Sequence, residues 1–339
     1  MSETPFRNQE LTRRQLLQTA AVLGAAGAAG LGLQAEAAAA VRGGKTAPLS
    51  AEEMAAVDAA LGKKGKAVDA EALYTTPLPR NDLKMSIKGV PVPIPFGFGG
   101  WVSLKKMQDG KSTMLMSDCV LLQEEVNPVI SAAQAHGLEV VALHNHFFYE
   151  EPRIFFMHLM GMGSPADLAR AFAAAIAPSK LLPANQPPAG PPPARTGRDI
   201  FDLPALDRIV GHTGAVNGPT YKYTVGRPDL TVISMGAVMT PAIGLNSWAA
   251  FAGTPDTAHV AGDMAMLPAE VNPVIHALRQ HNLEVVAVHN HMIDDNPRII
   301  FLHYYGTGPA TALAQGFRAA LDQLGRRGGG RQRQRREDG

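Results

Sequence analysis

The sequence is poor in cysteine, in aromatic residues and in excess charge of either sign. Its 339 residues include one cysteine, Cys119, so the chain can form no internal disulfide and no zinc site built from cysteines. Aromatic residues make up 6% of the sequence and the formal net charge is +1, which leaves little to stack on bases or to attract phosphates. We therefore expect no nucleic-acid partner, and any metal site must use histidine and carboxylate ligands.

The N-terminal segment has the composition of an export signal. The pair Arg13-Arg14 precedes an apolar stretch rich in alanine and glycine, from Ala20 to Leu33, and Ala35-Glu36-Ala37 follows as a small-x-small cleavage site. The apolar stretch is shorter than the ~20 residues that a membrane-spanning helix needs. We predict that residues 1–37 are a twin-arginine-type signal peptide, and that the mature protein is periplasmic or secreted with no stable membrane anchor.

The rest of the chain contains a duplicated segment. Residues 125–175 align with residues 270–320 without a gap, and 28 of the 51 positions are identical. This identity predicts two repeat domains, at residues 50–177 and 200–324, joined by a Pro-rich linker at residues 178–199. The final segment, residues 325–339, is rich in arginine, glycine and glutamine, and we predict that it is a disordered basic tail.

The patterning within each repeat predicts the α+β class, with largely antiparallel strands and about three helices. Ser50 and Glu53 form the pattern of a capping box at the start of a helix that reaches Leu61. Short segments of alternating polarity that follow are typical of strands. Two copies of one such fold are suited to pack about a pseudo-twofold axis.

The best-preserved block of each repeat predicts a helix, two strands and a final helix. Asn127-Pro128 and Asn272-Pro273 have the pattern of an N-cap followed by a proline in the first turn, so we place a helix start there. Residues 139–147 and 153–160 are predicted to form a hairpin. The final helix is expected to begin at Ser164 or, in the second repeat, Pro309.

Histidines are the residues that most strongly suggest chemistry. Eight of the eleven form matched pairs between the repeats. His144 and His146 are two residues apart in a predicted strand, so their side chains leave the same face of the sheet. A hairpin turn near Glu151 brings His158 opposite them. The same spacing predicts a second triplet in the second repeat, formed by His289, His291 and His303.

Three imidazoles on one face of a sheet suit a transition metal such as zinc or copper. The sequence predicts one such site in each repeat, with Glu125 as the fourth ligand of the first and Glu270 as that of the second. Asp118 and Asp263 are the second choice, either as ligands or as groups that orient an imidazole ring. Two alternatives stay open: a pocket in which the histidines bind a small polar ligand without a metal, and a structural role for buried histidines.

Two other matched pairs have simpler explanations. His136 and His281 fall at the predicted ends of helices, where a positive charge interacts favourably with the helix dipole. Arg153 and Arg298 each follow a proline in the hairpin turn. We expect them to anchor the turn through the acidic residues at positions 150 and 295 rather than to bind a substrate.

Three blocks of the sequence together resemble a known family. The blocks Glu-Val-Asn-Pro-Val, Ala-Leu-His-Asn-His and Pro-Arg-Ile-x-Phe-x-His-x-x-Gly-x-Gly are similar to the LppY/LpqO family of exported bacterial proteins, and both repeats carry them with minor changes. The resemblance implies an exported protein with a domain of unknown function and names no activity, substrate or metal. Because the chain lacks the lipoprotein cysteine of that family, we expect no lipid anchor.

These observations predict an exported protein with a metal site in each repeat, where the metal is stored, sensed or used in hydrolysis. The partner is then a metal ion or, on the alternative reading, a small polar ligand. The sequence has no recognisable Ser-His-Asp spacing or nucleophile motif, so it leaves open whether the protein is an enzyme.

Overall fold

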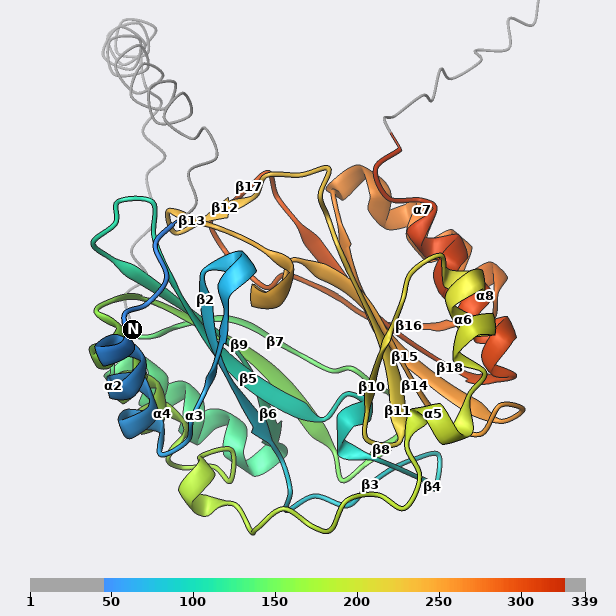
Figure 1. Ribbon diagram of the computed structural model, residues 1–339, viewed down its shortest axis with the longest axis horizontal. Coiled ribbons are helices and arrows are strands. Elements are labelled where there is room, and N and C mark those ends of the chain that lie inside the picture. The colour runs from blue at the N-terminus through green and yellow to red at the C-terminus, as the bar shows by residue number, and fades with distance from the viewer. Residues whose placement is uncertain (1–45, 327–339) are drawn as a thin grey trace, which may run out of the picture. The chain divides into compact units, whose positions relative to one another are not determined.

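Each repeat forms one six-stranded antiparallel sheet (Figure 1). The computed structural model describes residues 46–326, so the predicted signal peptide at residues 1–37 and the tail from residue 327 lie outside the described residues. The first sheet has the strand order β1 (Lys66–Val68), β2 (Leu73–Pro79), β5 (Gly99–Lys106), β6 (Thr113–Leu122), β9 (Ile154–Gly163) and β7 (Glu139–His144). The second sheet has the matching order β10 (Ala215–Asn217), β11 (Thr220–Gly226), β14 (Asn246–Gly253), β15 (Ala258–Met266), β18 (Ile300–Gly308) and β16 (Glu284–His289).

A small three-stranded sheet accompanies each large one. In the first repeat it has the order β4 (Val90–Val92), β3 (Met85–Ile87) and β8 (Glu150–Glu151). In the second repeat it has the order β13 (Ala237–Val238), β12 (Ile233–Ser234) and β17 (Asp295–Asn296). Each small sheet thus pairs an early segment of its repeat with the connection between the last two long strands.

Helices pack on one face of each large sheet, at opposite sides of the picture in Figure 1. The first repeat has α2 (Ala51–Leu61), α3 (Gln123–Ala135) and α4 (Pro165–Ile176). The short helix α5 (Gly197–Ile200) and the helices α6 (Leu203–Val210), α7 (Val271–Gln280) and α8 (Ala310–Leu321) follow the linker. These elements, with their antiparallel sheets, confirm the α+β class and the duplication.

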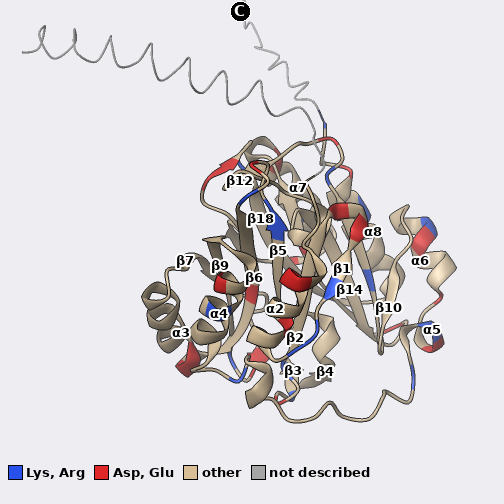
Figure 2. Cartoon of the chain, turned by 60° about the vertical axis from the view of Figure 1, so that its left-hand side comes forward, with Lys and Arg blue, Asp and Glu red and all other residues tan. Residues whose placement is uncertain are grey.

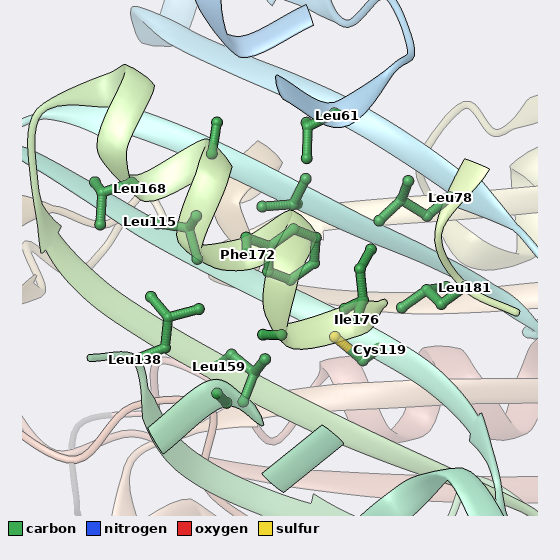
Figure 3. Close-up of a cluster of buried hydrophobic side chains, with 14 of the residues drawn as sticks. Leu61, Leu78, Leu115, Cys119, Leu138, Leu159, Leu168, Phe172, Ile176 and Leu181 are labelled. Atoms are coloured by element: carbon green, nitrogen blue, oxygen red, sulfur yellow. The ribbon is translucent and has the colours of Figure 1, made fainter. Parts of the chain in front are cut away.

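The helix-covered face of the first sheet has an apolar core. Leu115 and Cys119 of β6 pack with Leu159 of β9 against Phe172 and Ile176 of α4 (Figure 3). The predicted capping box is confirmed at the start of α2, where Ser50 and Glu53 bond to each other's backbone N–H groups. Because α2 and α4 lie against each other, this cap fixes the N-terminal edge of the helical layer.

The opposite faces of the two sheets share their apolar surroundings. Met114 and Met116 of β6 belong to one buried cluster with Phe301 of the second repeat, and Phe156 belongs to another with Tyr305. Nine of the ten residues of β6 are buried, because one face of the strand meets helices and the other meets the second repeat. The repeats therefore have a common interior between their sheets.

The helix start predicted at Asn127-Pro128 is several residues too late, and the one predicted at Asn272-Pro273 is about two residues too late. Helix α3 begins at Gln123, and in the second repeat a 3-10 turn, Pro268–Glu270, leads directly into α7. In α3 the Glu125 side chain accepts a hydrogen bond from the Leu122 backbone N–H at 2.8 Å, so Glu125 rather than Asn127 completes the cap. Pro128 is exposed and lies inside α3, beyond its first turn, where the missing N–H leaves the carbonyl group of Glu124 without its helical hydrogen bond.

Before α5 begins at Gly197, the linker has little regular structure. The linker includes one 3-10 turn, Pro183–Asn185, and Gln186 bonds to the Asp82 carboxylate at 3.1 Å, which attaches this part of the linker to the first repeat. Basic and acidic residues stand side by side on α5 and α6 (Figure 2), as the near-neutral net charge suggests. Within residues 46–326, no helix has the length and apolar character that crossing a membrane requires.

Candidate metal centre

Two neighbouring strand pairs place the histidines and aspartates of each repeat. In the first repeat, His158 of β9 lies opposite Ala142 of β7, and His144 of β7 lies opposite Phe156. His144 and His158 therefore project from the same face as diagonal neighbours, as predicted from the hairpin pattern. On its other side, His158 lies directly opposite Asp118 of β6. The second repeat repeats this register, with Asp263 opposite His303.

His146 and His291 lie just beyond the ends of their strands. Strand β7 ends at His144 rather than at residue 147, so His146 belongs to the loop that follows it. The His146 ring stacks on Phe156 with the ring centres 3.3 Å apart, and His291 stacks on Phe301 at 3.4 Å. This stacking holds both rings beside the strand histidines although neither is in a strand.

The six histidines meet in one cluster between the sheets, where two separate sites were expected. The ring centres of His144 and His289 are 3.8 Å apart, and those of His158 and His291 are 4.2 Å apart. Nε2 of His303 lies 3.2 Å from Nε2 of His144. Every one of these contacts joins one repeat to the other, so the cluster exists only because the repeats pack face to face.

Three groups of side chains in this cluster have donor atoms within 4.8 Å of one another and could hold a metal ion. The largest comes entirely from the second repeat and includes a carboxylate: Asp263, His289, His291 and His303. The other two combine the repeats: His144 and His146 with His303, and His144 and His158 with His289. The predicted triplet of the second repeat is thus brought together, whereas that of the first repeat is divided between two groups.

Glu125 and Glu270, the carboxylates preferred from sequence, have other partners. Glu125 receives a hydrogen bond from the buried Arg80 guanidinium at 2.7 Å and one from the backbone N–H of Lys180 at 2.8 Å. Glu270 has the same relation to Arg227, at 2.7 Å. Among the described residues, the groups that could hold a metal contain Asp263 and neither glutamate. From sequence, Asp263 was the second choice as the carboxylate ligand. Its position opposite His303 results from the pairing of two strands, and the distance between the residues along the sequence does not reveal that pairing.

Burial makes neutral imidazole the favoured state of the cluster. It lowers the pKa of His144, His146 and His289 well below the usual value, and neighbouring histidines lower it further. Burial also lowers the pKa of His158, to about 4. A neutral ring keeps a lone pair on one nitrogen, which metal binding requires.

Backbone carbonyl groups determine which nitrogen carries that lone pair in two of the rings. Nδ1 of His158 lies 2.9 Å from the carbonyl oxygen of Ser117, and Nδ1 of His303 lies 3.1 Å from that of Gly262. Because a carbonyl oxygen only accepts, each Nδ1 must donate, and each Nε2 is left with the lone pair. Both Nε2 atoms therefore have the protonation state of a metal ligand.

The two aspartates differ in their surroundings. Burial raises the pKa of Asp118 to about 6, although neighbouring histidines oppose the effect. Burial acts the same way on Asp263, but His303 and His291 outweigh it and hold the pKa of Asp263 below its usual range. Oδ2 of Asp263 lies 3.2 Å from Nε2 of His291, and Oδ1 accepts two backbone N–H groups. Asp263 is therefore the more firmly ionised of the two.

Many polar atoms of the cluster are buried without a hydrogen-bond partner among the described residues. They include Nδ1 and Nε2 of both His146 and His289, Nε2 of His158, Nδ1 of His144 and His291, and Oδ1 of Asp118. Leaving a polar group buried and unpaired costs about 1–3 kcal/mol. A metal ion would satisfy several of these atoms at once.

A cavity of about 140 Å³ lies beside the cluster. Four matched pairs from the two repeats line it: Trp101 and Trp248, Asp118 and Asp263, His146 and His291, and His158 and His303. A fifth pair, Thr75 and Lys222, also lines it and differs in charge. Trp101, Trp248, Asp118, His146 and Lys222 also line an adjoining pocket of about 480 Å³. The histidines are therefore reached through a lined passage.

Lys222 was not singled out from the sequence. Its Nζ lies 4.2 Å from the centre of the Trp248 ring, and burial lowers the pKa of Lys222 to about 8 although Asp118 and Asp263 oppose the shift. The alignment of the two repeats could have pointed to Lys222, because it places this lysine opposite a threonine, Thr75.

The remaining matched pairs have the roles predicted for them. His136 and His281 are the C-cap residues of α3 and α7. Arg153 pairs with Glu150 at 3.2 Å, and Arg298 pairs with Asp295 at 2.8 Å. Both pairs anchor the turns before β9 and β18, as expected.

The fold and the cluster define a class of protein: a duplicated α+β chain whose repeats together enclose one histidine-rich site. A family model matches residues 55–178 and 204–323, which correspond to the two repeats. The chain belongs to this family, which is described as Domain of Unknown Function (DUF1259). Among curated proteins, none matches the chain.

Two solved structures share weak similarity with the chain. The trimeric bacterial microcompartment shell protein PduB is 12% identical, with 76% of this chain and 89% of that chain covered and a TM-score of 0.18. EtuB from Clostridium kluyveri is 9% identical, with 66% and 85% covered and a TM-score of 0.18. TM-scores this low carry no argument about fold or function.

Proposed function

We propose that this protein binds a transition metal in one centre shared by its two repeats. The observation that carries the proposal is the set of buried, unpaired imidazole nitrogens in the cluster. Neutral imidazole with a carboxylate suits zinc or copper, and also iron or nickel. The group of Asp263, His289, His291 and His303 is the proposed site, because it has the most donors and the only carboxylate.

The geometry favours one ion per chain. Any two of the three possible groups share a histidine: His303, His289 or His144. A neutral imidazole has one lone pair to give, so an ion in one group removes a ligand from each of the others. This proposal replaces the expectation of one ion in each repeat.

The cavity beside the centre favours a role in which a small molecule reaches the metal. The four protein donors of the proposed site would fill a tetrahedral ion, so a small molecule would bind the metal as a fifth ligand, an expansion that catalytic zinc sites undergo. The passage lined by Trp101 and Trp248 gives such a molecule access. We therefore favour metal-assisted chemistry or sensing over storage.

A second candidate is a pocket that binds a small polar ligand without a metal. The contact between Nε2 of His303 and Nε2 of His144 at 3.2 Å favours it, because two neutral imidazoles form that hydrogen bond when no ion separates them. In this case His144 donates its Nε2 proton and His303 accepts it.

Metal content separates the two candidates. The mature protein is purified after export without metal-chelating chromatography, and its metals are counted by mass spectrometry. We expect about one ion per chain in the wild type and in the matched control His136→Ala, whose histidine is exposed at a helix end, and less than about a tenth in Asp263→Asn and His291→Ala. A wild-type chain without metal, or an Asp263→Asn variant with full metal, would contradict the proposal.

The proposal includes three points that are carried forward from the sequence. We propose that the chain is a member of the LppY/LpqO family, that residues 1–37 direct twin-arginine export to the periplasm or the exterior, and that the repeats are related by an approximate twofold axis. The matched sheet orders and the matched pairs around the cavity support the last point. The paired arginines before a weakly hydrophobic stretch support the second.

A further inference from the structure

Five matched positions of the two repeats line the cavity beside the histidines, and one of these pairs differs in charge. Where the first repeat places Thr75, the second places Lys222. Both residues occupy the same position of their sheets, on β2 and β11, one residue after the aligned tyrosines. The lysine is thus the one ammonium group among these matched positions. Further lining residues come from the second repeat alone: Thr224, Ala242, Gly244 and Asn246.

Lys222 shares the cavity with Asp118 and Asp263 but is directly bonded to neither. No ion pair or hydrogen bond joins its Nζ to a carboxylate within residues 46–326, and Nζ lies 4.2 Å from the centre of the Trp248 ring. The ring face stabilises the cation without neutralising it. Its ammonium group therefore keeps its capacity to bind an anion in the cavity.

The charges around the cavity favour an anion once a metal is present. Asp118 and Asp263 are negative and Lys222 is positive, so a divalent ion on neutral histidines leaves a single excess positive charge. In a half-buried site this excess is poorly screened by salt. A ligand with one negative charge would balance it.

We propose that this cavity binds a small oxyanion, of the size of formate or bicarbonate, between the metal and the ammonium group of Lys222. The inference rests on the proposed metal site and adds the class of ligand to it. The volume of about 140 Å³ suits a ligand of a few atoms, and the adjoining pocket provides its route from solvent. One oxygen binds the metal and another accepts a hydrogen bond from Nζ.

The test uses the full mature protein loaded with Co²⁺, whose visible absorption reports changes in its ligands. Formate is titrated into the wild type, Lys222→Thr, Lys222→Arg and the matched control Lys64→Thr, which removes an exposed lysine that lines neither the cavity nor the adjoining pocket. The metal content of each sample is measured in parallel. Lys222→Thr introduces the residue that the first repeat has at the matching position, Thr75, so it tests how much the positive charge contributes to formate binding.

We expect formate to change the wild-type spectrum, and Lys222→Thr to bind formate about tenfold more weakly or worse at unchanged metal content. Lys222→Arg and Lys64→Thr should bind as the wild type does. Equal formate affinity in Lys222→Thr, or no spectral change in the metal-loaded wild type, would overturn the anion pocket and leave the metal site intact. If no sample holds metal, the proposed function fails, and calorimetry with formate then decides whether the lysine alone binds an anion.

Discussion

Replacing Glu125 with Gln separates the two roles that this carboxylate can have. From sequence it is a metal ligand, whereas in the structure it neutralises the buried Arg80 and caps α3. Glutamine keeps the size and shape of the side chain but removes the charge. All the groups that contact the Glu125 oxygens are N–H donors, from Arg80, Leu122 and Lys180. The new NH₂ group of glutamine would therefore face donors on whichever side it lies.

The magnitude follows from what is left around Arg80. Removing one partner of a buried ion pair costs about 3–5 kcal/mol. Arg80 is fully buried but keeps Asp82, which accepts from Nε and Nη2 at 2.9 Å each. We therefore expect the lower end, about 3 kcal/mol of unfolding free energy. For a compact unit of this size, about 2 °C of melting temperature is lost per kcal/mol, which gives roughly 6 °C.

The assay combines thermal or urea unfolding with a metal count on the same sample. We expect Glu125→Gln to lose stability and to keep about one metal ion per chain. Asp263→Asn should lose its metal ion, because it removes a ligand of the proposed site. If Glu125→Gln instead lost its metal at unchanged stability, the carboxylate would be a ligand after all, and our description of the centre would be refuted.

The remaining predictions concern pH, the turns and export. A histidine whose pKa is lowered by folding stabilises the folded state above about pH 6.5, and this contribution is lost as the pH falls toward about 4, the pKa of His158. The metal-free protein should therefore unfold at lower urea concentration at pH 5 than at pH 7. Asp118, with its pKa raised to about 6, makes the opposite contribution to stability over this pH range, but it is one group against six histidines. An unchanged urea midpoint of unfolding between pH 7 and pH 5 would therefore contradict the reasoning. Arg153→Ala should change stability by less than about 1 kcal/mol in urea unfolding, because its ion pair with Glu150 is half-exposed; a larger loss would mean that the turn depends on it. Changing Arg13 and Arg14 to Lys should leave uncleaved precursor in the cytoplasm, as an immunoblot of cell fractions would detect, and normal export would exclude the twin-arginine route.

Features that depend on local chemistry were predictable from the sequence. The capping box at Ser50 follows from side chains that bond within a few residues of themselves, and α3 and α7 end where Gly137 and Asn282 adopt a positive φ. The pairing of β7 with β9 follows from the short connection between two strand-like segments, although β7 ends at His144 and leaves His146 in the loop. The helix start was misplaced because Asn127-Pro128 is a good local cap, yet the ion pair of Glu125 with Arg80, 45 positions away, prevails.

Features that depend on packing between the repeats were not predictable in the same way. The triplet spacing says that three histidines share a face, but not that the face meets its copy. One signal existed: β6 is apolar on both faces, as a strand covered by two layers must be. From the sequence, only the helices could be identified as a layer that covers β6. The structure shows that the second layer is the other repeat. The preference for Glu125 over Asp118 had a different origin, because the neighbour of Asp118 is set by the β6–β9 register within the first repeat, which sequence distance does not reveal.

Placing one shared site between two repeats of a single chain changes how that site can vary. If two identical chains formed such a site, every substitution would occur twice in it, and a lysine at the position of Lys222 would face a second lysine across the cavity. In a fused chain each half is encoded separately, so one half can change while the other remains the same. Thr75 and Lys222 are such a difference, within a lining whose tryptophans, aspartates and histidines have all stayed in pairs. The duplication within one chain therefore gives this site a direction, with a lysine on one side and a threonine on the other, that a symmetric dimer cannot have.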